Sequence, residues 1–484
     1  MPVSAASPCQ SMLQTVSGGD DKQLHVIPER VHFIGIGGAG MSGLARILLE
    51  LGHHVSGSDL AGTKVTERLE KQGAVCFTGH RGENVGHVQM VVVSSAIKKD
   101  NPELLQAERK GIPVIHRAEL LALLMKRQRG IAVAGAHGKT TTTSMLALVL
   151  ESNSLDPTIV VGGELNDIGG NAKLGRGEYL VAEADESDGS FLKLDPTAAI
   201  ITNVEDDHLD YYGTVEKIKE AFRGFINKIP SDGMAVLCLD DPGVREVAAD
   251  FKGPRMFYGV HRQEADYTLR NIYLNGAVSR AEVYFRGEFL GMLELLVPGI
   301  HNMSNALGVV AAARWAGLEF FDIAGALKKF RGAGRRFQVL GEVRGIRVVD
   351  DYAHHPSEIK ATLRAARQVG MGRVISVFQP HRYTRTSLLR ERFGTAFSDA
   401  DVIILSDIYS AGEQPIEGVS GRIIAEAIEN FENRPVTYLP TREDIVNYLV
   451  DFVRPGDLIL TMGAGNIWTA GIDLVKRLQA VEGS

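Results

Sequence analysis

One stretch, residues 131–143, constrains this chain more than any other. It opens with a short apolar run typical of a strand, turns at Gly135 and Gly138, and passes through Lys139 and Thr140 into a helical pattern. In such an arrangement, backbone N–H groups and the helix N-terminus surround phosphate oxygens. The stretch therefore predicts a nucleoside triphosphate site in an α/β sheet.

This loop departs from the strict pattern G-x-x-x-x-G-K-[ST], because Val133 stands where the first glycine belongs. Lys139 is expected at the β- and γ-phosphates, and the Thr140 hydroxyl on a magnesium ion. A Gly-Lys-Thr sequence at an ordinary strand-to-helix turn is the alternative, but the flanking strand and helix favour a nucleotide. The expected contacts of the triphosphate are Gly135, Ala136, His137, Gly138, Lys139, Thr140 and Thr141.

Size and charge narrow the class of protein. A chain of 484 residues has room for about three domains. The formal net charge of −7 argues against nucleic acid bound through a broad basic face. Cys9, Cys76 and Cys238 lack metal-like spacing, which indicates reduced thiols. No apolar run is long enough for a membrane span, and residues 1–24 predict a disordered leader. We therefore expect a cytoplasmic protein that binds small molecules.

A second glycine motif lies near the N-terminus. Residues 31–34 predict a strand that leads into Gly35, Gly37 and Gly40, which match G-x-G-x-x-G, and Asp59 follows about 20 residues on. This pattern is typical of a dinucleotide-binding fold, although any diphosphate can bind at such a helix start. NAD or FAD, another nucleotide diphosphate, and a glycine turn without a ligand all stay open here.

Two acidic segments follow apolar strands predicted beside the phosphate loop. One strand ends in four acids between residues 183 and 188, and the strand at 198–204 runs into an acidic segment that contains His208. Carboxylates at strand ends next to a triphosphate can supply oxygen ligands for magnesium. Solvated acidic loops and a structural histidine are the alternatives, but two such segments after a phosphate loop favour a metal site.

Alternating strand and helix patterns divide the whole chain. Residues 265–294 show two-residue periodicity, which predicts a small antiparallel section, and strand–helix alternation resumes after residue 335. We expect an α/β protein with a Rossmann-like first domain, a central P-loop domain with the antiparallel section, and a Rossmann-like last domain. The predicted limits are 1–24 for the leader, 25–130, 131–334 and 335–484 for the three domains.

Nine short motifs, taken in order, make a more specific pattern than any of them alone. Together they resemble the Mur ligase family, and the resemblance runs from about residue 31 to the C-terminal helix, leaving out only the leader. The motifs begin at Gly35, Gly57, Gly135, Glu183, Asn203, Gly299, Arg335, Asp350 and Gln379.

The resemblance implies an activity and its ligands. Members of this family join a carboxylate to an amine with ATP and magnesium, through an acyl phosphate. Within the family, the motifs are most similar to the branch that adds L-alanine to UDP-N-acetylmuramate in the cytoplasmic synthesis of peptidoglycan precursors. The glycine motif at residues 35–40 then becomes a cradle for a UDP-sugar. A monomer or weak homodimer is expected.

The resemblance also implies roles for individual residues. It adds to the ATP site Asn302, Arg336 and Asp351. It assigns to the amino acid Tyr352, His354, Arg382 and Arg385. It assigns to magnesium Thr140, Glu183 and His208. It assigns to the UDP-sugar Gly35, Gly37, Gly38, Ala39, Gly40, Met41, Ser58, Asp59, Ser94, Ser95, Ala96 and Ile97. It implies catalytic roles for Lys139, His208, Asn302, Arg336, His354, Arg382 and Arg385.

Two points are left open by these motifs. Many relatives hold a second metal ion with a carbamylated lysine, but residues 220–224 of this chain contain no lysine. Two ions are still expected, with His208 at the second. Three alternative functions are a muropeptide-recycling ligase that acts on the same UDP-sugar, an NAD-dependent oxidoreductase, and a nucleotide-sensing protein without catalysis.

Overall fold

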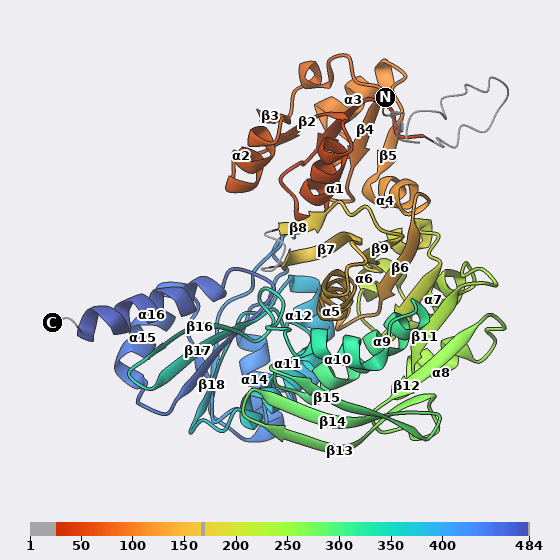
Figure 1. The fold of residues 1–484 in the computed structure, drawn as a ribbon. Coiled ribbons are helices and arrows are strands. Elements are labelled where there is room, and N and C mark those ends of the chain that lie inside the picture. The colour runs from red at the N-terminus through yellow and green to blue at the C-terminus, as the bar shows by residue number, and fades with distance from the viewer. Residues whose placement is uncertain (1–25, 166–169, 483–484) are drawn as a thin grey trace, which may run out of the picture.

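The computed structural model describes residues 26–165 and 170–482, and these residues form three β-sheets, each with its own helices (Figure 1). The first sheet stands as a separate lobe above the other two. The leader predicted for residues 1–24 lies outside the described residues. The predicted three-part α/β organisation is confirmed.

The first sheet is entirely parallel, with strand order β3-β2-β1-β4-β5. Its strands are β1 (Arg30–Ile34), β2 (His54–Asp59), β3 (Val75–Thr78), β4 (Met90–Val93) and β5 (Val114–His116). The order places β1 beside β4, so the loop after β1 opens at the point where ligands bind in such sheets. The helices are α1 (Ala39–Glu50), α2 (Lys64–Lys71), the 3₁₀ helix η1 (Gly82–Val85), α3 (Pro102–Arg109) and α4 (Arg117–Met125).

The second sheet has ten strands in the order β15-β14-β13-β12-β11-β10-β6-β9-β7-β8. The strand before the phosphate loop, β6, is central and pairs in parallel with both β9 and β10. The strands are β6 (Arg129–Ala134), β7 (Thr158–Leu165), β8 (Gly170–Lys173), β9 (Tyr179–Glu183), β10 (Ala198–Ile201), β11 (Met234–Cys238), β12 (Arg255–Gly259), β13 (Tyr267–Asn275), β14 (Val278–Phe285) and β15 (Glu288–Leu295). The helices are α5 (Lys139–Ser152), η3 (Ser190–Lys193), α6 (Leu209–Tyr212), α7 (Val215–Ile226), α8 (Pro242–Ala248), α9 (Ile300–Trp315) and α10 (Phe320–Leu327).

The predicted antiparallel section is present at one end of this sheet. Strands β13, β14 and β15 pair antiparallel, and the turn between the last two has positive φ at Arg286 and Gly287. The β7–β8 hairpin at the opposite end was not predicted. Its pairing is irregular between Val160 and Leu165, which obscures the two-residue periodicity on which strand prediction depends.

The third sheet has six strands in the order β16-β17-β21-β18-β19-β20, and only β16 is antiparallel to its neighbour. The strands are β16 (Gln338–Val343), β17 (Ile346–Asp351), β18 (Val374–Phe378), β19 (Val402–Leu405), β20 (Thr437–Tyr438) and β21 (Leu458–Met462). The helices are α11 (Pro356–Gln368), α12 (Tyr383–Leu388), α13 (Arg390–Phe393), α14 (Arg422–Glu432), α15 (Arg442–Phe452) and α16 (Trp468–Glu482).

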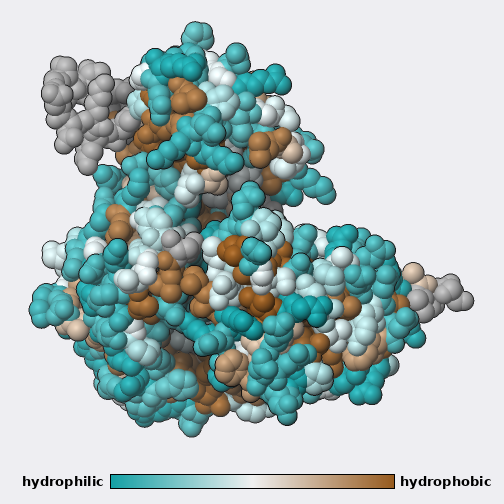
Figure 2. All heavy atoms as spheres, turned by 180° about the vertical axis from the view of Figure 1, so that it is seen from behind, coloured by the Kyte–Doolittle hydropathy of each residue, from teal (hydrophilic) through white to brown (hydrophobic). Residues whose placement is uncertain are grey.

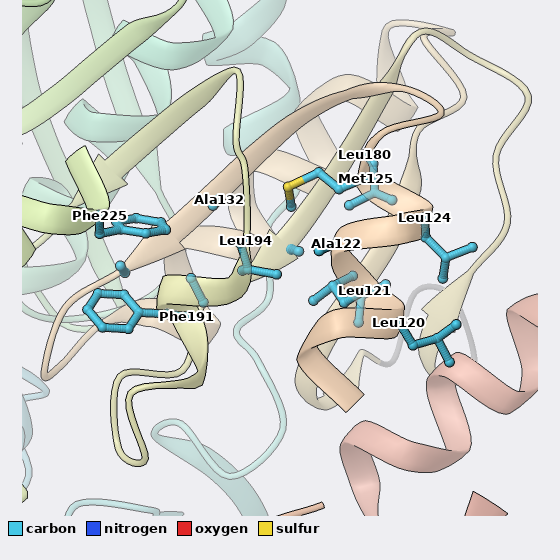
Figure 3. Close-up of a cluster of buried hydrophobic side chains, with 14 of the residues drawn as sticks. Leu120, Leu121, Ala122, Leu124, Met125, Ala132, Leu180, Phe191, Leu194 and Phe225 are labelled. Carbon is cyan, nitrogen blue, oxygen red and sulfur yellow. The ribbon is translucent and has the colours of Figure 1, made fainter. Parts of the chain in front are cut away.

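Helix α4 joins the first domain to the second through a shared apolar core. Leu121 and Met125 lie with Phe191 and Leu194 in one cluster of buried side chains (Figure 3). Sequence patterning predicts a helix from 120 to 129, but α4 ends at Met125 and residue 129 already belongs to β6. The second sheet therefore begins at residue 129, two residues before the predicted start of the central domain at 131.

The outer surface is mainly hydrophilic, as expected when apolar side chains are buried in cores. Seen from behind, hydrophilic residues cover most of the molecule, and hydrophobic residues form small separate groups (Figure 2). In the described part of the chain, no helix combines the length and apolar character that crossing a membrane requires.

Candidate functional site

The loop between β6 and α5 has a backbone shape that only glycine allows at two positions. Gly135 and Gly138 have φ of 140° and 82°. A Cβ at Gly135 would lie 2.1 Å from the Thr202 hydroxyl, and one at Gly138 would lie 2.8 Å from Asn305 Oδ1. Asn203 holds the loop from β10, because its Oδ1 accepts from the His137 N–H at 2.8 Å. The loop therefore stands against the ends of two neighbouring elements.

Lys139 is folded back over this loop and carries its charge there. Its Nζ donates to Gly135 O at 2.6 Å, to Ala136 O at 3.1 Å and to Glu186 Oε1 at 2.9 Å. Burial alone would lower the pKa of Lys139, but the carboxylates of Glu186 and Asp185 outweigh it and raise that pKa. The ammonium group is thus charged beside the loop, where it can exchange protein oxygens for phosphate oxygens.

Hard oxygen ligands meet at the start of α5. The Thr140 hydroxyl lies 3.1 and 3.0 Å from the two oxygens of Glu183, whose Oε2 also accepts from the Gly162 N–H at 2.9 Å. A hydroxyl and a carboxylate are ligands that magnesium prefers, so these two residues fit the predicted ion. Burial lowers the pKa of His208, which leaves a neutral imidazole, as metal ligation requires.

His208 does not contact Glu183 in this structure. Its Nε2 lies 3.6 Å from Glu186 Oε1 and 3.5 Å from Asp207 Oδ2. The backbone of His208 is left-handed, with φ of 59°. The predicted metal ligands are therefore arranged as a close pair, Thr140 and Glu183, with His208 beside Glu186 and Asp207.

A cavity of 230 Å³ lies where the phosphate loop, α9 and the third domain meet. The predicted ATP-site residues that line it are His137, Gly138, Thr141, Asn302, Arg336 and Asp351. Residues that sequence reasoning missed also line it, namely Glu205, His301, Asn305, Ser357 and Glu358. Three separate segments predicted to bind ATP are thus brought to one cavity.

Two residues that were predicted to bind the nucleotide form hydrogen bonds with backbone groups in this structure. Asn302 Nδ2 donates to Pro298 O at 2.7 Å. Asp351 accepts from the N–H groups of Phe337 and Ala353, both at 2.8 Å, and burial raises its pKa to about 6. Their amide and carboxylate groups therefore hold the cavity wall in this state of the protein.

Glu358 is the charged centre of the wall contributed by α11. Its carboxylate lies 3.4 Å from Arg336 Nη1, 3.2 Å from His354 Nδ1 and 3.3 Å from His137 Nδ1. Burial raises its pKa, but these neighbours outweigh it and hold the pKa well below its ordinary value. Glu358 is the N3 residue of a capping box in which His355 is the N-cap residue.

Two of the four predicted amino-acid residues line a second, smaller pocket. It is lined by Arg382 and Arg385 from the third domain and by Asp207 and His208 from the second. Arg385 Nη2 donates to Asp207 Oδ1 at 2.9 Å, and both side chains are buried. Burial lowers the pKa of the nearby His354 to about 3, so this imidazole is neutral. Tyr352 packs edge-on against it at 5.4 Å.

The first glycine loop holds its predicted acid in place. The Gly37 N–H donates to Asp59 Oδ2 at 2.9 Å, and a Cβ at Gly37 would lie 2.8 Å from that oxygen. The Ser58 side chain is fully buried, and its hydroxyl donates to Glu103 Oε2 at 2.5 Å. The expectation that Ser58 lies at the nucleotide sugar stays a prediction.

The edge between the first and second domains adds groups that were not predicted. Arg117 lies against Gly40, with Nη1 3.1 Å from where a Cβ would stand, and it donates to Asp185 at 2.9 Å. The predicted Ser95 donates to Asp188 Oδ2 at 2.7 Å. The acids that follow β9 therefore face both glycine loops, although the sequence pointed only to metal binding.

Comparison with known proteins adds a family assignment to this geometry. Three domain models match in chain order: "Mur ligase family, catalytic domain" over residues 30–129, "Mur ligase middle domain" over 133–313, and "Mur ligase, glutamate ligase domain" over 335–465. Together they span most of the described chain.

Individual relatives agree with these matches. The chain is 66% identical over 459 residues to the UDP-N-acetylmuramate–L-alanine ligase of Pelotomaculum thermopropionicum, covering 95% of this chain and 98% of that protein. It is 56% identical to the ligase of the same name from Desulforamulus reducens, covering 94% and 99%.

Solved structures agree as well. The UDP-N-acetylmuramate-alanine ligase of Thermotoga maritima superposes with a TM-score of 0.80 at 30% identity, over 93% of this chain and 99% of that one. A murein peptide ligase from Psychrobacter arcticus gives 0.69 at 26% identity, over the same shares of the two chains.

Proposed function

This chain belongs to the Mur ligase family, and from that premise we propose how its residues join L-alanine to UDP-N-acetylmuramate with ATP. It is an ATP-dependent ligase that forms an amide bond. The observation that carries the residue assignment is the single cavity at which the phosphate loop, α9 and the third domain meet.

The reaction needs two steps because a carboxylate is a poor electrophile. In the first step, an oxygen of the muramoyl carboxylate attacks the γ-phosphorus of ATP, the bond to the β-γ bridging oxygen breaks, and ADP leaves. In the second, the amine of L-alanine attacks the acyl carbon, the proton leaves the nitrogen, and inorganic phosphate departs. The first step brings two anions together, so positioning and positive charge decide its rate.

Lys139 is the residue proposed to supply that charge at the phosphate loop. It leaves Glu186 and the loop carbonyls to contact the triphosphate, while the backbone N–H groups of residues 135–141 receive the phosphate oxygens. Arg336 and Asn302 complete the nucleotide site from the facing domain and α9. Asp351 supports that site through its backbone contacts.

Magnesium is proposed to be held by the Thr140 hydroxyl and the Glu183 carboxylate. When bound, the ion would offset the negative charge that gathers between the γ-phosphoryl group and the acceptor carboxylate. A second ion is proposed at His208, whose neutral imidazole is suited to ligation. Without the lysine that many relatives carry, its further ligands would come from the nearby acids Glu186 and Asp207.

The two remaining substrates are assigned to the two ends of the site. We place the UDP diphosphate at residues 35–41, with Arg117 as an added cation, and the uridine near Asp59 and residues 94–97. We place L-alanine in the pocket of Arg382 and Arg385, whose guanidinium groups suit a carboxylate, beside His354 and Tyr352. The cytoplasmic location and the oligomeric state stay predictions.

Release of inorganic phosphate tests this function directly. The protein should release phosphate with ATP, magnesium, UDP-N-acetylmuramate and L-alanine together, and much less when any one is withheld. Equal release without the UDP-sugar or without L-alanine would contradict it. Replacing L-alanine by a peptide that begins with L-alanine separates this ligase from a muropeptide-recycling enzyme. The findings above support the alanine-adding branch over that enzyme and over an NAD-dependent oxidoreductase.

A further inference from the structure

A polar cluster joins the phosphate loop to the third domain, and the mechanism above does not use it. Its centre is the hydroxyl of Ser357, in the first turn of α11. Ser357 Oγ lies 2.8 Å from His137 Nε2, 2.9 Å from Glu205 Oε2 and 2.7 Å from His355 Nδ1. His137 and Glu205 belong to the second domain, so one hydroxyl bridges two domains.

The number of protons in the cluster fixes its hydrogen-bond directions. Glu205 can only accept, so the single Ser357 proton points to Glu205. The His137 Nε2 contact is then a donation to the Ser357 oxygen, which has a lone pair to receive it. The His137 ring thus donates its Nε2–H to a residue of the third domain. This hydrogen bond exists only while the third domain is docked.

The other side of the same ring faces a second group of the third domain. His137 Nδ1 lies 3.3 Å from Glu358 Oε1, an ion-pair contact without hydrogen-bond geometry, and this carboxylate favours the charged form of the ring. His137 is therefore a cation between two carboxylates. Burial lowers its pKa, but Glu358 and Glu205 outweigh it and raise the pKa to about 10.

The backbone of His137 is held just as firmly from within the second domain. Its N–H donates to Asn203, and its carbonyl accepts from Thr202 Oγ1 at 2.6 Å and from Asn203 Nδ2 at 3.0 Å. The His137 backbone is therefore fixed within the second domain, and the third domain acts on its ring. His137 also lines the nucleotide cavity.

We propose that Ser357 is a positioning residue that couples docking of the third domain to nucleotide binding, by fixing the His137 side chain of the phosphate loop. This inference rests on the proposed function in one respect, namely that the nucleotide bound in the phosphate loop is ATP. Because coupling is reciprocal, a nucleotide in the loop favours docking as much as docking favours the nucleotide. Glu205 takes part by orienting the Ser357 proton.

Metal binding is the competing explanation of the same residues. His137, Glu205 and His355 offer ligand atoms within 4.8 Å of one another, which could suit a transition-metal ion. The Ser357 oxygen already stands within hydrogen-bond distance of all three groups, where such an ion would lie. A proton on both nitrogens of His137 also opposes ligation. We therefore assign the cluster to docking.

The test measures binding separately from catalysis. Ser357→Ala should weaken ADP binding, measured by calorimetry, and raise the KM for ATP, both by about tenfold, because it removes a hydrogen bond to a charged group. The kcat at saturating ATP should stay within about threefold, since excess nucleotide restores the docked form. Ser357→Thr keeps the hydroxyl and should restore both constants. The matched control is Ser398→Ala, an exposed serine of the same domain.

A double substitution asks whether Ser357 acts through His137. In a His137→Asn background, Ser357→Ala should add little to the loss of ADP affinity, because the two residues act as a unit. Glu205→Gln gives a second route, with the same expected fall in affinity, if Ser357→Ala folds poorly. Unchanged ADP affinity in Ser357→Ala, or a full additive loss in the His137→Asn background, overturns the inference.

The outcome is distinguishable from a failure of the proposed function. Wild-type protein that binds ADP but never needs L-alanine for phosphate release would contradict the proposed function and leave the coupling standing. If stoichiometric zinc raised the melting temperature of the wild type but not of His355→Ala, the cluster would be a metal site and the docking proposal would be wrong.

Discussion

The joint between the first and second domains differs in composition from the joint between the second and third. The first is an apolar core in which Leu121 and Met125 of α4 pack with Phe191 (Figure 3). The second is largely polar, with Arg385 bound to Asp207 and Ser357 bridging to His137. Polar contacts such as Arg117 to Asp185 occur at the first joint too, but at the edge nearest the glycine loops.

This difference indicates what each joint does. Apolar burial is non-directional and stabilises by about 1.5–3 kcal/mol for each large side chain, so it holds two domains together with or without a ligand. A buried ion pair gains little net stability after desolvation but depends on geometry. The second joint can therefore open and close around substrates, and its charges are available to a nucleotide once it forms.

The largest expected effect tests the positive charge of Lys139 in the phosphate loop, beside the joint between the second and third domains. Lys139→Ala should lower kcat/KM in the phosphate-release assay by about a thousandfold, which is about 4 kcal/mol of transition-state stabilisation. The variant also leaves the buried Glu186 carboxylate without its cation, so a loss of stability is expected, and kcat/KM is measured well below the variant's melting temperature. Lys126→Ala, at a half-exposed lysine 4.0 Å from Asp195, is the control and should retain wild-type activity. A variant at Lys139 that keeps near-normal turnover would refute the assignment.

The next effect tests the apolar joint. Phe191 is 1% exposed and packs against Phe222 and Phe225 at ring distances of 5.1 and 4.9 Å. Phe191→Ala should lower the free energy of unfolding by about 3–4 kcal/mol in denaturant titration, with the KM for ATP unchanged in the folded protein. Phe321→Ala, at a phenylalanine 78% exposed, should have almost no effect. An unchanged midpoint for Phe191→Ala would mean that this core is not what holds the domains.

The third effect uses pH to weaken the polar joint alone. His137 has a raised pKa of about 10 against an ordinary 6.5, so its contribution is fully present below pH 6.5 and is lost as the pH rises toward 10. The difference in unfolding free energy between wild type and His137→Asn should shrink over that range, by at most about 1.4 kcal/mol per pH unit. A difference that grows with pH would show that His137 is neutral in the docked state.

The smallest effect concerns an exposed ion pair at the same joint. Arg392 Nη1 lies 2.5 Å from Asp206 Oδ1, but the two side chains are 42% and 32% exposed. Arg392→Ala should therefore change the ADP dissociation constant by a factor that corresponds to less than about 1 kcal/mol, and less still in high salt. A larger loss that persists in high salt would show that this pair belongs to the docking cluster.

Local patterns predicted the elements that carry their own signals. The strand, glycine loop and helix around Lys139 were predicted because apolar periodicity and turn glycines are local properties of the sequence. The start of β6 was not, since Arg129 pairs with Tyr179 of β9 and its guanidinium carbon lies 4.7 Å from the ring of Trp315. No local pattern reports a partner so distant in the chain.

The difference between local sequence signals and partners that are distant in the chain also applies to the candidate site. Sequence reasoning found His137 and Arg336 because each belongs to a motif, and the structure brings both to one cavity. It missed Ser357 as a partner of His137, because the two lie 220 residues apart and a serine at a helix start has an ordinary capping explanation. Ser58 shows the reverse case, since this motif position is buried and hydrogen-bonded within the first domain.

The segment that follows β10 has a consequence for how this chain can vary in length. Within seven residues, 202–208, it holds the phosphate loop through Asn203, reaches Ser357 through Glu205, pairs with Arg385 through Asp207 and presents His208. A single residue inserted in this segment would move several of these side chains away from their partners at the same time. The hairpin turn at Arg286 carries no such duties, so a library of insertions should leave viable enzymes there and almost none between 202 and 208.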